Sequence, residues 1–312
     1  MNEYTTDIRL MGSSFQFIVN AETKEAGHGF LVDCIEEVSR IEKLLTEFNV
    51  HSETSLINKY AGIHPVQVST ETYQFIARCI QISKLTDGSF DITAGALKKL
   101  YNFRNVEIEL PAESKIKDCL NITGYRKIKL LTNNRIYLEH KGMHIGFGAI
   151  GKGYAAHKVM KLIQQKGVQG GVINASGDLC VWGTKHDGSQ WNAGIANPDS
   201  PDEILLWLQL NGQSIATSGN YEQYFELNGV RYSHNINPWN GRPVTGIKSV
   251  SVISPHAELS DALATAVTVM GLSQGLRLIS QLPYTHCIII DDLDQIHFSN
   301  NIERARLFKK TA

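Results

Sequence analysis

Residues 259–271 read Leu-Ser-Asp-Ala-Leu-Ala-Thr-Ala-Val-Thr-Val-Met-Gly. Leu263, Val267 and Met270 recur at helical spacing and form an apolar stripe. Asp261 and Thr265 are one turn apart, so they share a face roughly opposite this stripe. A carboxylate and a hydroxyl on one helical face are two hard oxygen ligands of the kind that suits Mg²⁺. The alternative is that Asp261 is a favourable charge near a helix N-terminus and Thr265 a tolerated polar residue.

The segments around this helix mix helical and strand patterns and predict a mixed α/β fold. Apolar periodicity predicts helices over 29–45, 70–85 and about 154–165. Strands are expected at 4–10, 14–19, 135–139, 171–175, 179–183, 205–210, 249–254, 287–291 and 295–298. A hairpin is predicted over 225–232, with Asn228-Gly229 at its turn, and irregular structure over 102–125. Because no repeat or flexible linker divides the chain, we expect one compact domain over residues 1–312.

The composition restricts the class of protein. The chain has 312 residues, of which 42% are apolar and 20% charged, and its net charge is −1, so it can bury a large core. No block of lysine and arginine stands out, which argues against nucleic-acid binding. The five cysteines include no Cys-x-x-Cys pair, which argues against a disulfide framework and a structural zinc site. The N-terminus has no apolar signal core and no apolar run could span a bilayer, so we expect a soluble cytoplasmic protein; a removed export or lipoprotein signal is the alternative.

A glycine-rich turn, Gly146-Phe-Gly-Ala-Ile-Gly-Lys-Gly-Tyr154, follows a predicted strand and opens a predicted helix. Glycines let a backbone approach a ligand closely, and a helix N-terminus offers unpaired N–H groups to an anion. Lys152 can add a positive charge next to a phosphate. The spacing fits neither a Walker A loop nor a dinucleotide-binding fingerprint. A structural tight turn is the alternative interpretation.

Two further polar segments are candidates for a site. In Thr86-Asp-Gly-Ser-Phe-Asp-Ile-Thr-Ala-Gly-Ala-Leu97, Asp91 either caps the following helix or grips a polar ligand. His234 ends a predicted strand and enters a turn rich in Asn, Pro and Gly, which is a suitable place for a general base. A purely structural histidine is the alternative.

Five blocks of sequence, in order, carry a resemblance to a known family. They are Met11-Gly-Ser-Ser, Ser52-Glu53 with Asn58, the 88–97 block, the glycine-rich turn, and a last block of Ala216-Thr-Ser-Gly, Tyr232-Ser-His and Ser260-Asp-Ala-Leu-Ala-Thr265. With these blocks, which run over nearly the whole chain, the sequence resembles the ApbE flavin transferases, also called FAD:protein FMN transferases.

The resemblance implies a T-fold-like α/β architecture that binds FAD and Mg²⁺. Such enzymes split the FAD pyrophosphate, release AMP and attach FMN through a phosphoester to a threonine of a partner protein. Typical partners are subunits of sodium-pumping quinone reductases and of Rnf-type electron-transfer complexes. Some members instead hydrolyse FAD to FMN and AMP. We therefore expect a transferase, with a FAD pyrophosphatase and a non-catalytic flavin-binding protein as alternatives.

The resemblance also implies roles for individual residues. The metal ligands would be Asp261, Thr265 and the backbone carbonyl of Ala149, and His234 would be the catalytic base. The FAD-binding residues would be Met11, Phe48, Ser89, Phe90, Asp91, Gly146, Lys152 and Ile236.

Several positions depart from the family pattern. Gly146 stands where a FAD-contacting Asp is common, and Phe48 stands where a Tyr is usual. Asn220, Asn237 and His157 also replace frequent Asp residues. Asp261, Thr265 and His234 are intact, which favours turnover over mere flavin storage.

Overall fold

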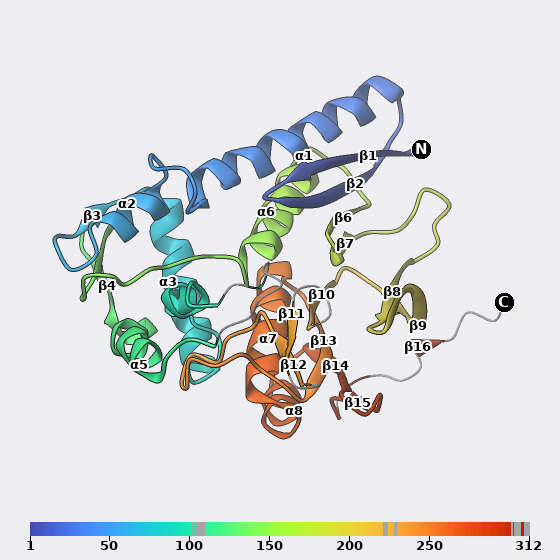
Figure 1. Ribbon diagram of the computed structural model, residues 1–312. Helices are drawn as coiled ribbons and strands as arrows, with labels where there is room; N and C mark the ends of the chain where they lie inside the picture. The colour runs from blue at the N-terminus through green and yellow to red at the C-terminus, as the bar shows by residue number, and fades with distance from the viewer. Residues whose placement is uncertain are drawn as a thin grey trace.

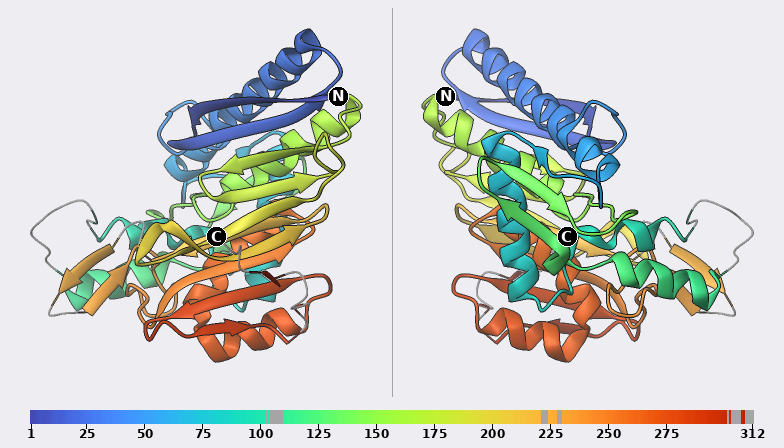
Figure 2. Two further views of the ribbon diagram at one scale, coloured as in Figure 1. Left: turned by 90° about the vertical axis from the view of Figure 1, so that its right-hand side faces the viewer. Right: turned by 90° about the vertical axis from the view of Figure 1, so that its left-hand side faces the viewer.

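An eight-stranded sheet runs through the molecule in the order β1-β2-β6-β7-β10-β13-β14-β15 (Figures 1 and 2). The computed structural model describes residues 1–101, 103, 110–220, 224–227, 230–300, 302, 307 and 308. Neighbouring strands of the sheet pair antiparallel. The strands are β1 (Asn2–Leu10), β2 (Ser13–Ala21), β6 (Gly171–Ala175), β7 (Asp178–Trp182), β10 (Ser214–Gly219), β13 (Ile247–Ser254), β14 (His286–Asp291) and β15 (Ile296–Phe298).

A two-residue turn joins β1 to β2. Met11 and Gly12 both have positive φ, 50° and 74°, which is the conformation that matches the twist of a tight hairpin. Along β2, Phe15, Phe17 and Val19 alternate into the core, as the two-residue period of a strand requires. The turn holds Met11 at one end of the hairpin, next to α6.

Helices cover one face of the sheet (Figure 1). They are α1 (Lys24–Leu45), α6 (Gly151–Gln165), α7 (Ala257–Met270) and α8 (Leu272–Ser280). Helix α1 packs on β1 and β2, α6 on β6 and β7, α7 on β10 and β13, and α8 on β14. Helix α1 buries Leu31, Cys34, Val38, Ile41 and Leu45, a stripe at helical spacing.

The other face of the sheet is covered by a small antiparallel sheet, visible beside the main sheet in Figure 1. Its strands are β8 (Trp191–Asn197), β9 (Ser200–Leu210) and β16 (Leu307–Phe308). Trp191 and Ile195 of β8 pack in one cluster with Val172, Val181 and Ile215 of the main sheet. The main sheet is therefore buried on both faces in its centre.

A second group of elements lies beside α6 and α7 (Figure 1). It contains α2 (Glu53–Lys59), β3 (Val66–Gln67), α3 (Thr70–Leu85), η1 (Ile92–Ala94), α4 (Gly95–Lys98), α5 (Glu113–Ile122), η2 (Tyr125–Lys127), β4 (Ile128–Leu131), β5 (Arg135–Leu138), and the hairpin β11 (Tyr224–Leu227) and β12 (Val230–Ser233). The hairpin strands β11 and β12 overlap α7 in the view of Figure 1, and Figure 2 shows them next to α5. Phe75 of α3 stacks on Tyr154 of α6 with ring centroids 4.1 Å apart. Tyr154 also donates a hydrogen bond to Glu71, which pairs with Arg40 of α1. These contacts fix α3 against α1 and α6.

The predicted mixed α/β fold is confirmed, and the predicted helices and strands are present. Where mixed sheets were expected, the strand pairings of the described residues are antiparallel. The prediction for 102–125 was wrong in part, because this range contains α5 and the first residue of η2. The Asn228-Gly229 turn lies outside the described residues. Among the described helices, none combines the length and the apolar character needed to cross a bilayer.

Helix α7 differs from its predicted surroundings. It is buried on nearly all sides, because it lies between α6 and the main sheet. Ala262, Ala264 and Ala266 are as buried as Leu263 and Val267, and Thr265 is only half-buried. The face that carries Asp261 and Thr265 is consequently not a solvent face but borders a cavity.

Candidate functional site

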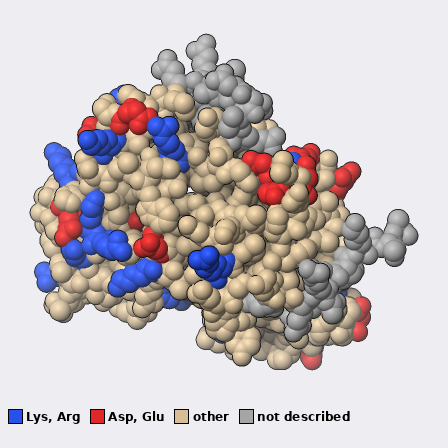
Figure 3. Space-filling model, turned by 90° about the horizontal axis from the view of Figure 1, so that it is seen from below, with Lys and Arg blue, Asp and Glu red and all other residues tan. Residues whose placement is uncertain are grey.

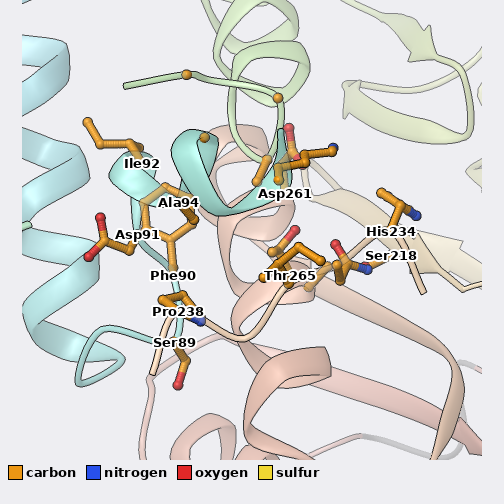
Figure 4. Close-up of a pocket in the computed structure, with 18 of the residues that line it drawn as sticks. Ser89, Phe90, Asp91, Ile92, Ala94, Ser218, His234, Pro238, Asp261 and Thr265 are labelled. Carbon is orange, nitrogen blue, oxygen red and sulfur yellow. The ribbon is translucent and has the colours of Figure 1, made fainter. Parts of the chain in front are cut away.

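A cavity of about 190 Å³ lies where α7, the turn before α6, the loop before η1 and the segment after β12 meet (Figure 4). Its walls contain every predicted site residue except Met11 and Phe48. These are Ser89, Phe90, Asp91, Gly146, Ala149, Lys152, His234, Ile236, Asp261 and Thr265. Segments that are far apart in the sequence thus contribute to one site.

Helix α7 forms one wall of the cavity. Asp261 and Thr265 project from the same face of the helix (Figure 4), as their spacing predicts. Asp261 is only 7% exposed, and its Oδ2 accepts a hydrogen bond of 3.0 Å from the backbone N–H of Gly153. A Cβ atom on Gly153 would lie 2.3 Å from the carbonyl oxygen of Ala257, so only glycine permits this contact between α6 and α7. The glycine at 153 therefore fixes the orientation of the Asp261 carboxylate.

The glycine-rich turn forms a second wall. The carbonyl of Phe147 accepts hydrogen bonds from the N–H groups of Ile150 and Gly151 and so closes the turn that leads into α6. Helix α6 begins at Gly151 rather than at 154, so Lys152 lies within its first turn. Ala149 and Lys152 both line the cavity.

Asp178 is a site residue that the sequence analysis missed. Its Oδ2 lies 2.9 Å from Nζ of Lys152, and its Oδ1 accepts a hydrogen bond of 3.1 Å from the N–H of Thr217. The side chain is 7% exposed. Burial raises the pKa of Asp178, and the charge of Lys152 and the hydrogen bonds offset part of this rise. The signal available in the sequence was an acidic residue directly after Ser176-Gly177, within a largely apolar stretch.

The loop before η1 supplies buried residues. Ser89 is 2% exposed, and its Oγ has no hydrogen-bond partner among the described residues. Phe90 is 1% exposed and faces the cavity. A buried hydroxyl without a partner is costly, which is consistent with a ligand that completes it.

Asp91 takes the capping role that was its alternative interpretation. Its Oδ1 accepts hydrogen bonds from the backbone N–H and the hydroxyl of Thr93, and its Oδ2 accepts one from the N–H of Tyr125. The carboxylate points away from Asp261 and Thr265 (Figure 4). The carboxylate of Asp91 therefore holds the loop in place, although Asp91 also borders the cavity.

A buried polar network holds the segment that carries His234. Nδ2 of Asn235 donates to Oγ of Ser218 at 3.0 Å and to Oδ1 of Asn220 at 3.2 Å. Oγ of Ser233 donates to the same Oδ1 at 2.5 Å. These bonds attach Asn235 to β10 and both neighbours of His234 to Asn220, the residue that follows β10. His234 therefore lies on the side of the cavity next to Ser218 (Figure 4).

Met11 and Phe48 lie in an adjoining cavity of about 420 Å³ rather than in the first one. The two cavities share Glu47, Gly148 and Lys152. Phe48 is 91% exposed, so its ring offers an open apolar surface.

In the view from below, lysine and arginine side chains gather on one side of the molecule with acidic side chains between them (Figure 3).

The residues of the first cavity suit a hard divalent cation. The carboxylate of Asp261, the hydroxyl of Thr265 and the backbone of Ala149 border the same space. Over the described part of the chain, no group of three or more His, Cys, Asp or Glu side chains is placed to hold a metal. A mixed oxygen set with few carboxylates is typical of Mg²⁺, which takes the rest of its ligands from water and substrate phosphates.

Comparison with known proteins identifies the family of this chain. The ApbE family profile matches residues 11–289. The chain belongs to the ApbE family. A relative from Klebsiella pneumoniae, named FAD:protein FMN transferase, is 32% identical over 267 residues, which are 85% of this chain and 80% of the relative. A protein of the same name from Treponema pallidum is 28% identical over 279 residues, 84% of this chain and 77% of that protein.

Solved ApbE structures share the fold. The ApbE protein of Thermotoga maritima superposes with a TM-score of 0.88 at 29% identity, covering 96% of this chain and 97% of that one. The flavin transferase ApbE of Vibrio cholerae superposes with a TM-score of 0.84 at 22% identity, covering 96% and 98%. The predicted ApbE architecture and the predicted transferase class are both confirmed by these relatives.

Proposed function

We propose that this ApbE protein is a Mg²⁺-dependent FAD:protein FMN transferase. It would cleave the FAD pyrophosphate, attach FMN through a phosphoester to a threonine of a partner protein and release AMP. One observation carries the proposal: Asp261, Thr265, Ala149, Lys152 and His234 border a single cavity in a chain whose relatives are named for this activity.

The side chains divide the chemistry between them. Lys152, held by Asp178 at 2.9 Å, would pair with the FAD phosphates. Asp261, Thr265 and the Ala149 carbonyl would hold Mg²⁺, which when bound supplies neutralisation of the phosphate charge. A threonine hydroxyl is a poor nucleophile at neutral pH, so a positioned base is needed. His234 would accept its proton.

The group transfer is a displacement at the phosphorus atom on the flavin side of the pyrophosphate. The threonine oxygen forms a bond to the phosphorus on the flavin side, and the bond from that phosphorus to the bridging oxygen breaks. AMP leaves with the electron pair, and the threonine proton stays on His234. A subunit of a sodium-pumping quinone reductase or of an Rnf-type complex, or another flavinylated protein, is the proposed acceptor.

The test is incubation of the protein with FAD, Mg²⁺ and an acceptor that carries the target threonine, followed by mass spectrometry. A covalent FMN adduct on the acceptor, absent when the threonine is replaced by alanine or the metal is chelated, supports the proposal. Free FMN and AMP without an adduct would select a pyrophosphatase. Retained, intact FAD would select a flavin-binding protein without turnover.

A further inference from the structure

We propose that Glu47, oriented by His144, is a subsite that recognises a sugar hydroxyl of the bound dinucleotide. The inference rests on the proposed function insofar as the ligand is FAD. Glu47 borders both cavities and lies at their junction, together with Gly148 and Lys152. Its side chain is 29% exposed, so a bound ligand can reach it.

The backbone around Glu47 is held in place. Helix α1 ends at Leu45, and the carbonyl of Glu47 accepts a hydrogen bond of 3.1 Å from Oγ of Ser55. The N–H of Phe48 donates to Oγ1 of Thr46 at 3.2 Å. The hydroxyl of Ser52 also donates to the carbonyl of Thr46. The Glu47 side chain therefore starts from a fixed position rather than from a free loop.

His144 fixes one carboxylate oxygen of Glu47. Nε2 of His144 lies 2.5 Å from Oε2 of Glu47, and Nδ1 of His144 lies 3.3 Å from Nζ of Lys99. An ammonium group can only donate, so Nδ1 is the acceptor and Nε2 carries the proton that His144 donates to Glu47. Asn58 exchanges two hydrogen bonds with the backbone of Ile145, which secures the segment behind the imidazole.

The other oxygen of Glu47 faces Gly146. A Cβ atom on Gly146 would lie 3.2 Å from Oε1 of Glu47, so the glycine leaves this side of the carboxylate uncrowded. The hydrogen bond from His144 lowers the pKa of Glu47, although burial opposes the effect. Glu47 is thus ionised near neutral pH and can only accept hydrogen bonds.

The ionised Glu47 carboxylate at the junction of the two cavities determines which part of a dinucleotide can bind next to it. Phosphate oxygens would be repelled by the carboxylate and attracted to Lys152. Sugar hydroxyls are donors, and an acidic residue that accepts from a ribose hydroxyl is an established mode of dinucleotide recognition. A cation is disfavoured because Lys98 borders the same cavity and His144 presents a proton to Glu47. The ribityl chain and the adenosine ribose offer the same chemistry.

The test compares FAD with two analogues, one without the ribityl 2′-hydroxyl and one without the 2′-hydroxyl of the adenosine ribose. Dissociation constants are measured by quenching of flavin fluorescence at fixed Mg²⁺. Wild type should bind one analogue about tenfold to a hundredfold more weakly than FAD, since a hydrogen bond to a charged group is lost. Glu47→Gln and Glu47→Ala should lose this discrimination. Glu36→Gln, which removes an exposed charge from α1, should keep it.

The outcomes separate the inference from the proposed function. If wild type does not bind FAD, the proposed function fails. If wild type binds FAD and discriminates against neither analogue, or if folded Glu47 variants discriminate as wild type does, only the inference is overturned. His144→Asn provides an independent variant, because it removes the orienting donor while Glu47 stays in place. It should weaken the same discrimination.

Discussion

The pair of Lys152 and Asp178 predicts a measurable coupling between the glycine-rich turn and β7. Asp178→Asn keeps the shape of the side chain and an oxygen that accepts from Thr217. It places an amide NH₂ group next to the ammonium of Lys152, where a carboxylate oxygen now lies at 2.9 Å. The lysine would lose its counter-charge and face a second donor.

The structure sets the size of the effect. Removing one partner of a fully buried ion pair costs about 3–5 kcal/mol. Lys152 is 23% exposed and borders a cavity that water can enter, so part of its charge is solvated after the change. We therefore expect a loss in the free energy of unfolding of about 2 kcal/mol, below the fully buried range.

Urea denaturation of Asp178→Asn, Lys152→Gln and the double variant measures the coupling directly. The double variant should be more stable than the sum of the single losses implies, with a coupling energy above about 1 kcal/mol. Addition of FAD should reduce the deficit of Asp178→Asn, because bound phosphates replace the missing negative charge. Single losses that add to within about 0.5 kcal/mol would refute the reasoning.

Three further predictions concern the helices around the cavity. Gly153→Ala should destabilise the protein by about 1–3 kcal/mol in urea denaturation, because the new Cβ would lie 2.3 Å from the carbonyl oxygen of Ala257; Gly151→Ala, whose Cβ meets only contacts of 3.5 Å or more, should not. Burial, reinforced by nearby positive charge, lowers the pKa of His157 to about 4, so the folded state binds fewer protons than the unfolded state from about pH 6.5 down to that value. Stability should fall as the pH drops through this window, and His157→Gln should reduce the slope by at most about 1.4 kcal/mol per pH unit. Asp261→Ala should abolish FMN release and transfer at millimolar Mg²⁺ in a folded protein, and wild-type turnover by this variant would place the metal elsewhere.

The sequence predicted the features that depend on neighbouring residues, such as helical spacing and turns. The spacing of Asp261 and Thr265 placed both residues on one face of α7, and the glycine-rich turn was expected to open a helix, which begins at Gly151 rather than at about 154. Helix α1 starts at Lys24, earlier than the predicted residue 29. The prediction began too late because Gly27, a poor helix former, lies in the first turns of the helix. There it lets the Tyr4 ring pack on the backbone, since a Cβ would lie 2.3 Å from that ring. Tertiary packing at this position therefore outweighs the low helix propensity of glycine.

The remaining errors concern contacts between distant segments. Asp178 became visible only when folding brought it to Lys152. Asp91 could cap a helix or bind a ligand, and the N–H of Tyr125, which belongs to a later segment, completes its capping role. Helix α5 was missed although Ile116, Cys119 and Leu120 recur at helical spacing, because its ten residues are otherwise mostly polar and it fully buries only Ile116. The separation of Met11 and Phe48 into a second cavity likewise depends on how the β1–β2 turn packs near α1.

The most direct test of the central claim is the rate of FMN transfer by His234→Asn. Asparagine keeps a polar side chain at the end of β12 but cannot act as a base. The account predicts that this variant melts and binds FAD as wild type does, yet transfers FMN to the acceptor threonine at least about a hundredfold more slowly. Near-normal transfer by a well-folded His234→Asn protein would contradict the assignment of His234 as the base in this cavity.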